Sequence, residues 1–166
     1  MPVPTIRIGV ISDTHGIIHP RVFELFADVD QILHAGDIGG EDVITALEAL
    51  APLQAVTGNT DAYPIVERYP EVLLTELNGV VIAMVHIFNG VSDPRLAQLA
   101  AEQHTGTPDM VIFGHSHKAE MRRENGVLLL NPGSAGRRRF HLRPAVATME
   151  ISEVQLYHAE ILYLDE

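Results

Sequence analysis

The alternation of apolar runs with amphipathic segments constrains the fold of this chain more than any other feature of its sequence. Three mainly apolar runs, at residues 5–11, 31–37 and 53–59, predict buried strands. The segments between them have apolar residues at helical spacing and predict helices over 19–29 and 41–50. The resulting order, β-α-β-α-β, is typical of a parallel sheet that is covered by helices.

The second half of the chain predicts more antiparallel structure. Asn125 and Gly126 lie between two strand-like runs, and this dipeptide is a strong signal for a tight hairpin turn. The elements expected here are strands over 80–86 and 109–115, a helix over 92–104, a hairpin over 119–133 and a final antiparallel pair over 145–152 and 154–164. We therefore expect one α/β domain of residues 1–166, with mixed sheets flanked by helices.

The composition argues against several classes of protein. Asp and Glu number 22 against 11 Lys and Arg, and the net charge of −11 repels nucleic acid and anionic membranes at long range. The chain has no cysteine, so it can form neither a disulfide nor a thiolate metal site. The N-terminal residues lack the pattern of a signal peptide, and the longest apolar stretch, "VVIAMVHIF", is too short to span a bilayer. We therefore expect a cytoplasmic protein with no nucleic-acid or membrane partner.

Polar motifs follow the ends of the predicted strands, where open α/β sheets form their sites. The motifs are "SDTHG", "HAGD", "GNTD", "VH", "GHSH" and "NPGS", in that order along the chain. Their oxygen and imidazole groups suit Mn, Fe, Co, Ni or Zn, and they suffice for two ions if one carboxylate bridges. The candidate ligands are Asp13, His15, Asp37, Asn59, His86, His115 and His117.

The order of these motifs resembles the calcineurin-like metallophosphoesterase superfamily. Its pattern of D-x-H, GD, GN-x-[DE], H and GH-x-H is present in full, and the resemblance covers about residues 6–135. The small size and the "NPGS" run are most similar to the compact bacterial and archaeal phosphodiesterases, the YfcE-like branch of that superfamily. The resemblance implies a metallophosphoesterase-type α/β sandwich that hydrolyses a small phosphodiester and can form homo-oligomers.

The resemblance also implies a role for each candidate ligand. Two divalent ions are expected, with manganese as the first choice and nickel, cobalt, iron or zinc as alternatives. A hydroxide between the ions would attack phosphorus, and Asn59 would also orient the phosphate. The first ion would be held by Asp13, His15 and His117, the second by Asn59, His86 and His115, and Asp37 would bridge the two.

Several residues in or beside these motifs are candidates for supporting roles at the site. Thr60 stands where larger members of the superfamily often carry a histidine, so we expect no general acid and a preference for good leaving groups, or protonation through water. Asp61 is expected to fix a neighbouring loop or histidine. His34 either supports the site or is an ordinary buried histidine. Asn131 and Ser134 either lie near the metals or only form a turn.

Two further segments also leave alternatives open. The arginines at 137–139 either form a solvated face, or one of them, Arg137, reaches a substrate phosphate. Ile87 and Phe88 follow His86 where relatives usually have glycine, and Phe88 either walls the substrate cleft or belongs to the core.

Two other functions are alternatives to the phosphodiesterase interpretation: a protein-binding scaffold and a phosphomonoesterase. One eukaryotic relative, a subunit of the retromer coat, keeps this fold as a protein-binding scaffold with a degraded metal site. The complete ligand set of the present chain favours catalysis over that role. The sequence does not separate a phosphodiesterase from a phosphomonoesterase.

Overall fold

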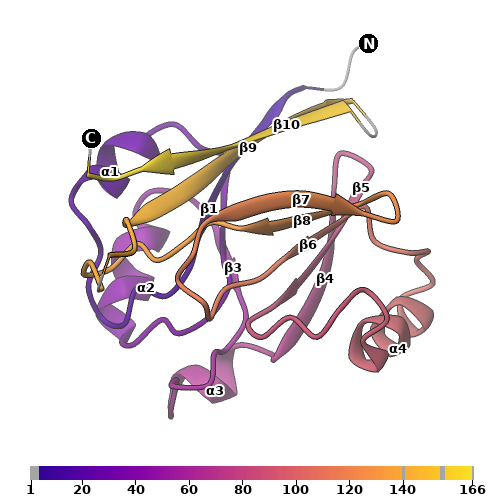
Figure 1. Ribbon diagram of the computed structural model, residues 1–166, viewed down its shortest axis with the longest axis horizontal. Helices are drawn as coiled ribbons and strands as arrows, with labels where there is room; N and C mark the ends of the chain where they lie inside the picture. The colour runs from indigo at the N-terminus through magenta and orange to yellow at the C-terminus, as the bar shows by residue number, and fades with distance from the viewer. Residues whose placement is uncertain (1–3, 140, 154–155, 166) are drawn as a thin grey trace.

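The computed structural model describes residues 4–139, 141–153 and 156–165, which form two five-stranded sheets packed face to face (Figure 1). One sheet has the strand order β10-β9-β1-β2-β3 and the other β4-β5-β6-β8-β7. In chain order the elements are β1 (Ile6–Ile11), α1 (Arg21–Leu25), β2 (Gln31–His34), α2 (Glu41–Glu48), β3 (Leu53–Ala55), α3 (Ile65–Arg68), β4 (Val72–Leu77), β5 (Val80–Val85), α4 (Pro94–Glu102), β6 (Met110–Ile112), β7 (Glu120–Glu124), β8 (Val127–Asn131), β9 (Ala145–Glu153) and β10 (Leu156–Tyr163). The predicted mixed sheets with flanking helices are confirmed.

The direction of the strands determines where the polar motifs lie. Strands β1, β2 and β3 run parallel to one another in the first sheet, and β5, β6 and β8 do so in the second. The carboxyl ends of parallel strands meet at one edge of a sheet. The "SDTHG", "HAGD" and "GNTD" motifs therefore gather at one edge, and the motifs that follow β5, β6 and β8 gather at the corresponding edge of the second sheet.

Three clusters of buried apolar residues hold the layers together. Ile8 and Val10 of β1 face the second sheet, where they pack in one cluster with Ile82 and Met84 of β5. A second cluster packs α1 and α2 against the outer face of the first sheet, and a third packs α4 against the outer face of the second. Because β1 is covered on both faces, its buried residues 8–11 form a continuous apolar run rather than an alternating one.

Some predicted boundaries differ from the structure. Helix α1 covers only Arg21–Leu25 of the expected 19–29, because the chain turns back toward β2 after Phe26, which is fully buried. Strand β4 was not predicted, although Asn78 and Gly79, both with positive φ, mark the hairpin that joins it to β5. The final antiparallel pair is confirmed as β9 and β10, while the expected start of the second strand at 154 lies outside the described residues. No helix in the described ranges is long and apolar enough to cross a membrane.

Candidate metal centre

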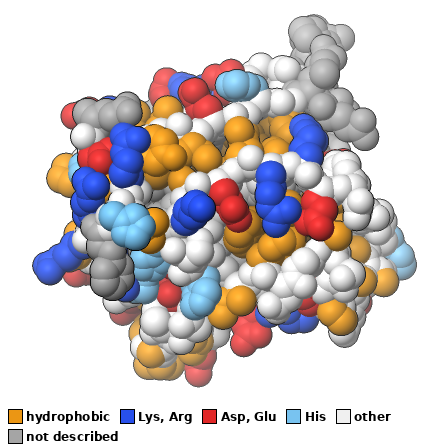
Figure 2. Space-filling model, viewed as in Figure 1, with side chains coloured by type: hydrophobic (Ala, Val, Ile, Leu, Met, Phe, Trp, Pro, Cys, Tyr) orange, Lys and Arg blue, Asp and Glu red, His pale blue; other side chains and the backbone are white. Residues whose placement is uncertain are grey.

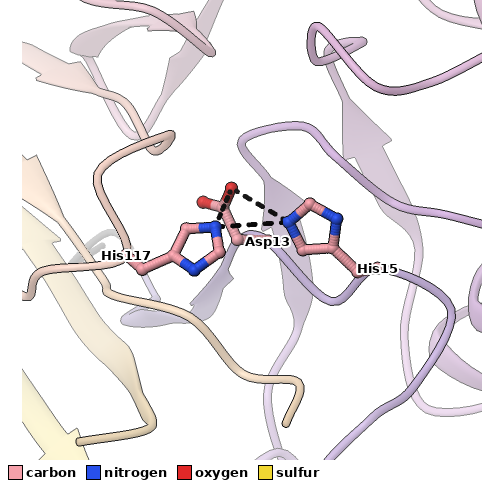
Figure 3. A group of neighbouring side chains, drawn as sticks. All are labelled: Asp13, His15 and His117. Atoms are coloured by element: carbon pink, nitrogen blue, oxygen red, sulfur yellow. Dashed lines mark hydrogen bonds and ion pairs between the residues drawn. The ribbon is translucent and has the colours of Figure 1, made fainter. Parts of the chain in front are cut away.

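Two groups of potential metal ligands lie where the two sheets meet at their carboxyl edges. In the first group, Asp13, His15 and His117 each offer a ligand atom within 4.8 Å of the others (Figure 3). Asp13 and His15 follow β1 and His117 follows β6, so residues about a hundred positions apart point at one space. His117 Nε2 lies 3.2 Å from Asp13 Oδ1 and 3.2 Å from His15 Nε2.

The second group consists of Asp37, His86 and His115, whose ligand atoms also lie within 4.8 Å of one another. Asn59 belongs beside it, because its Oδ1 is 3.1 Å from His115 Nδ1. Asp37 Oδ2 lies 3.2 Å from His86 Nε2 and 3.6 Å from His15 Nε2, which places this carboxylate between the two groups. The structure thus brings together all seven side chains that the sequence singled out.

Most of these residues have an unusual backbone. The φ angle is positive at Asp13 (54°), His15 (48°), Asp37 (55°), His115 (73°) and His117 (64°). Non-glycine residues seldom adopt this left-handed conformation, and such strain concentrates at functional sites, where the surrounding structure enforces it. The loops that follow β1, β2 and β6 therefore hold these side chains in place at a conformational cost.

Glycines let the loops of the site approach one another. A Cβ atom at Gly58 would lie 2.1 Å from Asp37 Oδ1, and one at Gly114 would lie 2.1 Å from Ser12 Oγ. Neither glycine has a positive φ, so close approach rather than turn geometry requires glycine there. Gly36 differs, because it combines a φ of 101° with a contact on the ring of His86.

Two buried polar atoms in this cluster lack a hydrogen-bond partner. Among the described residues, Asp13 Oδ1 and His86 Nε2 are the buried side-chain atoms in this condition, and they lie 3.8 Å apart. His86 Nδ1 lies 2.8 Å from the carbonyl oxygen of Ala35 and donates to it, so the lone pair of Nε2 faces the carboxylates. A cation satisfies such an arrangement, and nitrogen and oxygen donors without thiolate fit a divalent transition metal.

The charges of the cluster shift its pKa values. Burial by itself raises the pKa of Asp13, but contacts with His117 and Ser12 outweigh burial and lower it. Burial also opposes ionisation of Asp37, yet contact with His86 holds its pKa far below the ordinary value. Burial alone lowers the pKa of His86, but Asp37 and Asp13 raise it above the ordinary value. Both carboxylates are ionised at neutral pH, and the site attracts positive charge.

Asp61 and Thr60 support the loops around Asp37. The Asp61 carboxylate accepts hydrogen bonds from the backbone N–H groups of Ile38, Gly39 and Gly58, which fixes one loop against another. This supports the loop-fixing interpretation of Asp61. Thr60 contributes its backbone N–H, which donates to Asp37 Oδ1 at 2.9 Å.

The "NPGS" motif supports the loops that carry the first group. Ser134 Oγ donates to the carbonyl oxygen of Asp13 at 2.8 Å, and Asn131 Nδ2 donates to the carbonyl oxygen of Gly114 at 3.1 Å. Both side chains therefore position backbone beside candidate ligands. Ser12 was missed by the sequence analysis, although it directly precedes Asp13. Its hydroxyl donates to Asp13 Oδ2 at 2.7 Å, which leaves Asp13 Oδ1 facing the site.

His34 is a satisfied buried histidine that holds two loops. Its Nδ1 accepts from the backbone N–H of Gly36 at 3.1 Å, so its Nε2 donates to Thr14 Oγ1 at 3.0 Å. Thr14 in turn donates to the carbonyl oxygen of Ile38 at 2.8 Å. His34 thus links the "SDTHG" and "HAGD" motifs without facing the ligand cluster.

The pH dependence of stability tests this assignment. Complete burial lowers the pKa of His34 to about 4, so the unfolded chain binds this proton more readily than the folded one between about pH 6.5 and 4. We therefore expect the stability advantage of the native chain over His34→Gln to shrink by about 3 kcal/mol between pH 7 and 4. Urea unfolding of metal-free protein measures the difference. The exposed His158→Gln serves as the control, and an advantage that does not change with pH would contradict a neutral His34.

Two cavities open beside the two groups of ligands. The larger, of about 360 Å³, is lined by Asp13, His15 and the arginines at 137–139, among others. The smaller, of about 180 Å³, lies beside Asn59 and His86. Exposed Ile87 lines the smaller cavity, whereas Phe88 stacks on Phe113 with ring centroids 4.8 Å apart and packs against the core. Of the two roles considered for Phe88, the core role is the one observed.

Comparisons with known proteins point to one family. The Calcineurin-like phosphoesterase superfamily domain matches residues 6–154. A probable metallophosphoesterase of Methanothermobacter thermautotrophicus is 38% identical over 134 residues, which cover 76% of each chain. A phosphodiesterase of Methanocaldococcus jannaschii is 30% identical over 141 residues, covering 76% of this chain and 82% of the relative.

Solved structures share the fold along nearly the whole chain. A conserved protein of Streptococcus pneumoniae, described as a predicted phosphoesterase, superposes with a TM-score of 0.73 at 28% identity and covers 99% of this chain and 92% of its own. Vps29 of Entamoeba histolytica, solved in complex with Zn²⁺, superposes with a TM-score of 0.70 at 21% identity and covers 96% of this chain and 99% of its own. The two mixed sheets match the fold of these proteins.

Proposed function

The chain belongs to the calcineurin-like phosphoesterase superfamily, and from this premise we propose that it is a metal-dependent phosphodiesterase that acts on a small substrate. The observation that carries the proposal is the convergence of seven side chains with oxygen or imidazole donor atoms. Two of their buried atoms, Asp13 Oδ1 and His86 Nε2, have no hydrogen-bond partner among the described residues. The relative named a phosphodiesterase in M. jannaschii supports the same activity.

The geometry suggests how two divalent ions would be held. Asp13, His15 and His117 are the donors of one position, and Asn59, His86 and His115 those of the other. Asp37 lies close to histidines of both groups and is the proposed bridge. Manganese is our first choice, with nickel, cobalt, iron or zinc as alternatives. When bound, such ions lower the pKa of water and offset the negative charge of the phosphate in the transition state.

The protein's own groups orient the substrate and the ligands. The Asn59 side chain borders the smaller cavity, and its amide N–H can donate to a phosphate oxygen. Ala35 fixes the ring of His86 through its carbonyl oxygen, and a carbonyl partner of this kind raises the basicity of the opposite ring nitrogen. Ser12, Asp61 and Ser134 hold the loops so that the ligands need not reorganise during the reaction.

Cavities beside both groups favour a diester over a monoester. A phosphodiester carries two ester arms, and a substrate centred on the ligand cluster finds space on the Asp13 and His15 side as well as on the Asn59 and His86 side. A monoester has one such arm and needs one cavity. We therefore propose that each cavity accepts one arm.

Metal add-back tests this function. Protein stripped with a chelator is expected to be inactive and to hydrolyse bis(p-nitrophenyl) phosphate when Mn²⁺, Ni²⁺, Co²⁺, Fe²⁺ or Zn²⁺ is returned, with p-nitrophenyl phosphate turned over more slowly. Faster hydrolysis of the monoester would identify a phosphomonoesterase instead. Folded protein that is inactive with every metal would favour the scaffold role.

The absence of a histidine at position 60 leads to a prediction about leaving groups. The Thr60 hydroxyl is a poor proton donor at neutral pH, so hydrolysis should slow steeply as the pKa of the leaving alcohol rises. Thr60→His should raise the rate on a methyl phenyl or dialkyl diester, whose leaving group is more basic, more than the rate on the bis(p-nitrophenyl) ester, by about tenfold or more. The slope of log kcat against leaving-group pKa measures the effect. An unchanged slope in the variant would contradict the absence of a general acid.

A further inference from the structure

The larger cavity has a positively charged wall in an otherwise acidic protein. Three of the 11 Lys and Arg residues are consecutive at 137–139, and all three line this cavity together with Asp13 and His15. The three arginines are exposed. On the face shown in Figure 2, Lys and Arg side chains gather near several histidines toward the left side of the molecule. A concentration of positive charge at this cavity runs against the net charge of −11.

The three arginines differ in how their charge is used. Arg138 Nη1 lies 3.2 Å from Asp165 Oδ2, so this guanidinium has a carboxylate partner. Arg137 and Arg139 have no ion-pair partner among the described residues. The backbone at Arg139 is nevertheless held, because its carbonyl oxygen accepts from the N–H of Leu142 at 3.0 Å. Two guanidinium groups without an ion-pair partner in the described ranges thus border the cavity, and the backbone of one of them is hydrogen-bonded.

The other polar side chains of this cavity are already engaged. Thr14 Oγ1 donates to the carbonyl oxygen of Ile38, and Ser134 Oγ donates to that of Asp13. The carboxylate of Asp13 and the ring of His15 belong to the first group of candidate metal ligands. Arg137 and Arg139 are therefore the side chains of this cavity whose positive charge has no carboxylate partner among the described residues and whose donors are available to a ligand.

Arg139 lies beside the candidate metal centre. It lines the same cavity as His15, which belongs to the first group of candidate ligands. An anion bound in this cavity next to the ligand cluster would therefore face the positive charge of a guanidinium group.

We propose that Arg137 and Arg139 form an anion subsite, and that the preferred substrate is a phosphodiester with a second phosphate on the arm that enters the larger cavity. Two planar guanidinium groups can donate hydrogen bonds to several oxygens of one phosphate. A phosphate therefore fits this pair of arginines better than a single carboxylate does. The cavity of about 360 Å³ is within the range of small-molecule sites and has room for a phosphate with its linking group. The inference rests on the proposed function, because it assigns the arm beside the scissile phosphate.

Two chromogenic substrates that differ by one phosphate test the subsite. The p-nitrophenyl phosphodiester of thymidine is compared with the same ester carrying a phosphate on the other sugar hydroxyl. We expect the second phosphate to lower KM by about tenfold in the native protein at low salt, with kcat little changed, and the gain to decline as salt is added. In the Arg137→Gln/Arg139→Gln protein the two substrates should have the same KM.

Controls separate the subsite from the catalytic centre. Arg122→Gln/Arg123→Gln removes the same charge from exposed positions on β7 and should keep the tenfold gain. The Arg122→Gln/Arg123→Gln protein should also hydrolyse bis(p-nitrophenyl) phosphate at the native rate. The effect of Arg137→Gln/Arg139→Gln is read from the ratio of the KM values for the two thymidine esters, which compares substrates within one protein. Hydrolysis of both thymidine esters with equal KM by the native protein would overturn the subsite and leave the phosphodiesterase standing. A gain that survives in Arg137→Gln/Arg139→Gln would also overturn it. No hydrolysis of any ester with any metal would overturn the proposed function itself.

Discussion

Replacing Asp37 with asparagine should reduce phosphodiester hydrolysis by about a thousandfold, since removing a single preorganised electrostatic group from an active site commonly costs this much. Asp37 Oδ2 lies close to histidine nitrogens from both groups, 3.2 Å from His86 Nε2 and 3.6 Å from His15 Nε2. Asparagine keeps the shape and the acceptor for the Thr60 N–H but lacks the charge that two adjacent cations would require.

The control for this prediction is Asp42→Asn, which removes the same charge from an exposed position on α2. It should retain native kcat. The measurement is kcat for bis(p-nitrophenyl) phosphate at saturating metal, in variants whose circular dichroism spectrum is native. An Asp37→Asn protein within tenfold of the native rate would show that this carboxylate does not join two metal positions.

Gly58→Ala should cost activity and stability together. Its Cβ would lie 2.1 Å from Asp37 Oδ1 and 2.3 Å from the backbone nitrogen of Asp37, and real Cβ atoms do not approach other atoms so closely. Either the Asp37 loop or the Gly58 loop must move. We expect a loss of about 1–3 kcal/mol in the free energy of unfolding, as for other overpacked sites. The displaced carboxylate should lower kcat by about a hundredfold.

Gly106→Ala is the matched control, because nothing lies within 4 Å of the added Cβ and its φ is not in the left-handed region. It should be neutral or slightly stabilising, since alanine reduces the freedom of the unfolded chain. Urea unfolding and kcat are measured for both variants. If Gly58→Ala unfolds at the native urea concentration and keeps the native kcat, the two loops are not packed as closely as described here.

The candidate metal ligands were easier to predict from the sequence than the residues that hydrogen-bond to them. Metal-ligand chemistry restricts residue type, so Asp13, Asp37 and His86 could be chosen from the strand ends where parallel topology brings side chains together. Ser12 was missed because a serine beside an aspartate has many ordinary roles. It contacts Asp13 Oδ2, and Asp13 has a left-handed backbone that the sequence does not indicate in an obvious way.

In the fold, too, elements with a strong apolar pattern were easier to predict than elements whose extent depends on tertiary contacts. The buried runs that became β1, β5 and β8 have strong apolar patterns, and their existence follows from burial alone. Strand β4 has the weaker pattern of an edge strand, with Thr75 and Glu76 near its end, and it is stabilised by pairing with β5. Helix α1 is short because tertiary packing of Phe26 ends it, although its sequence has helical spacing for longer.

The roles of the glycines and arginines were the least predictable. Gly58 and Gly114 make room for Asp37 and Ser12 on other loops, and neither glycine has a positive φ. Such contacts join segments far apart in sequence. The arginines at 137–139 form one charge run in the sequence, yet Asp165 pairs with Arg138 and leaves Arg137 and Arg139 for the cavity.

Anomalous diffraction from crystals grown with Mn²⁺ would show whether the seven side chains bind two metal ions. We expect two manganese peaks in each chain, one among Asp13, His15 and His117 and one among Asn59, His86 and His115, with Asp37 contacting both. No peak at this cluster, in crystals that contain folded protein and millimolar Mn²⁺, would contradict the assignment of these residues as a metal centre. A single peak would contradict the dinuclear site.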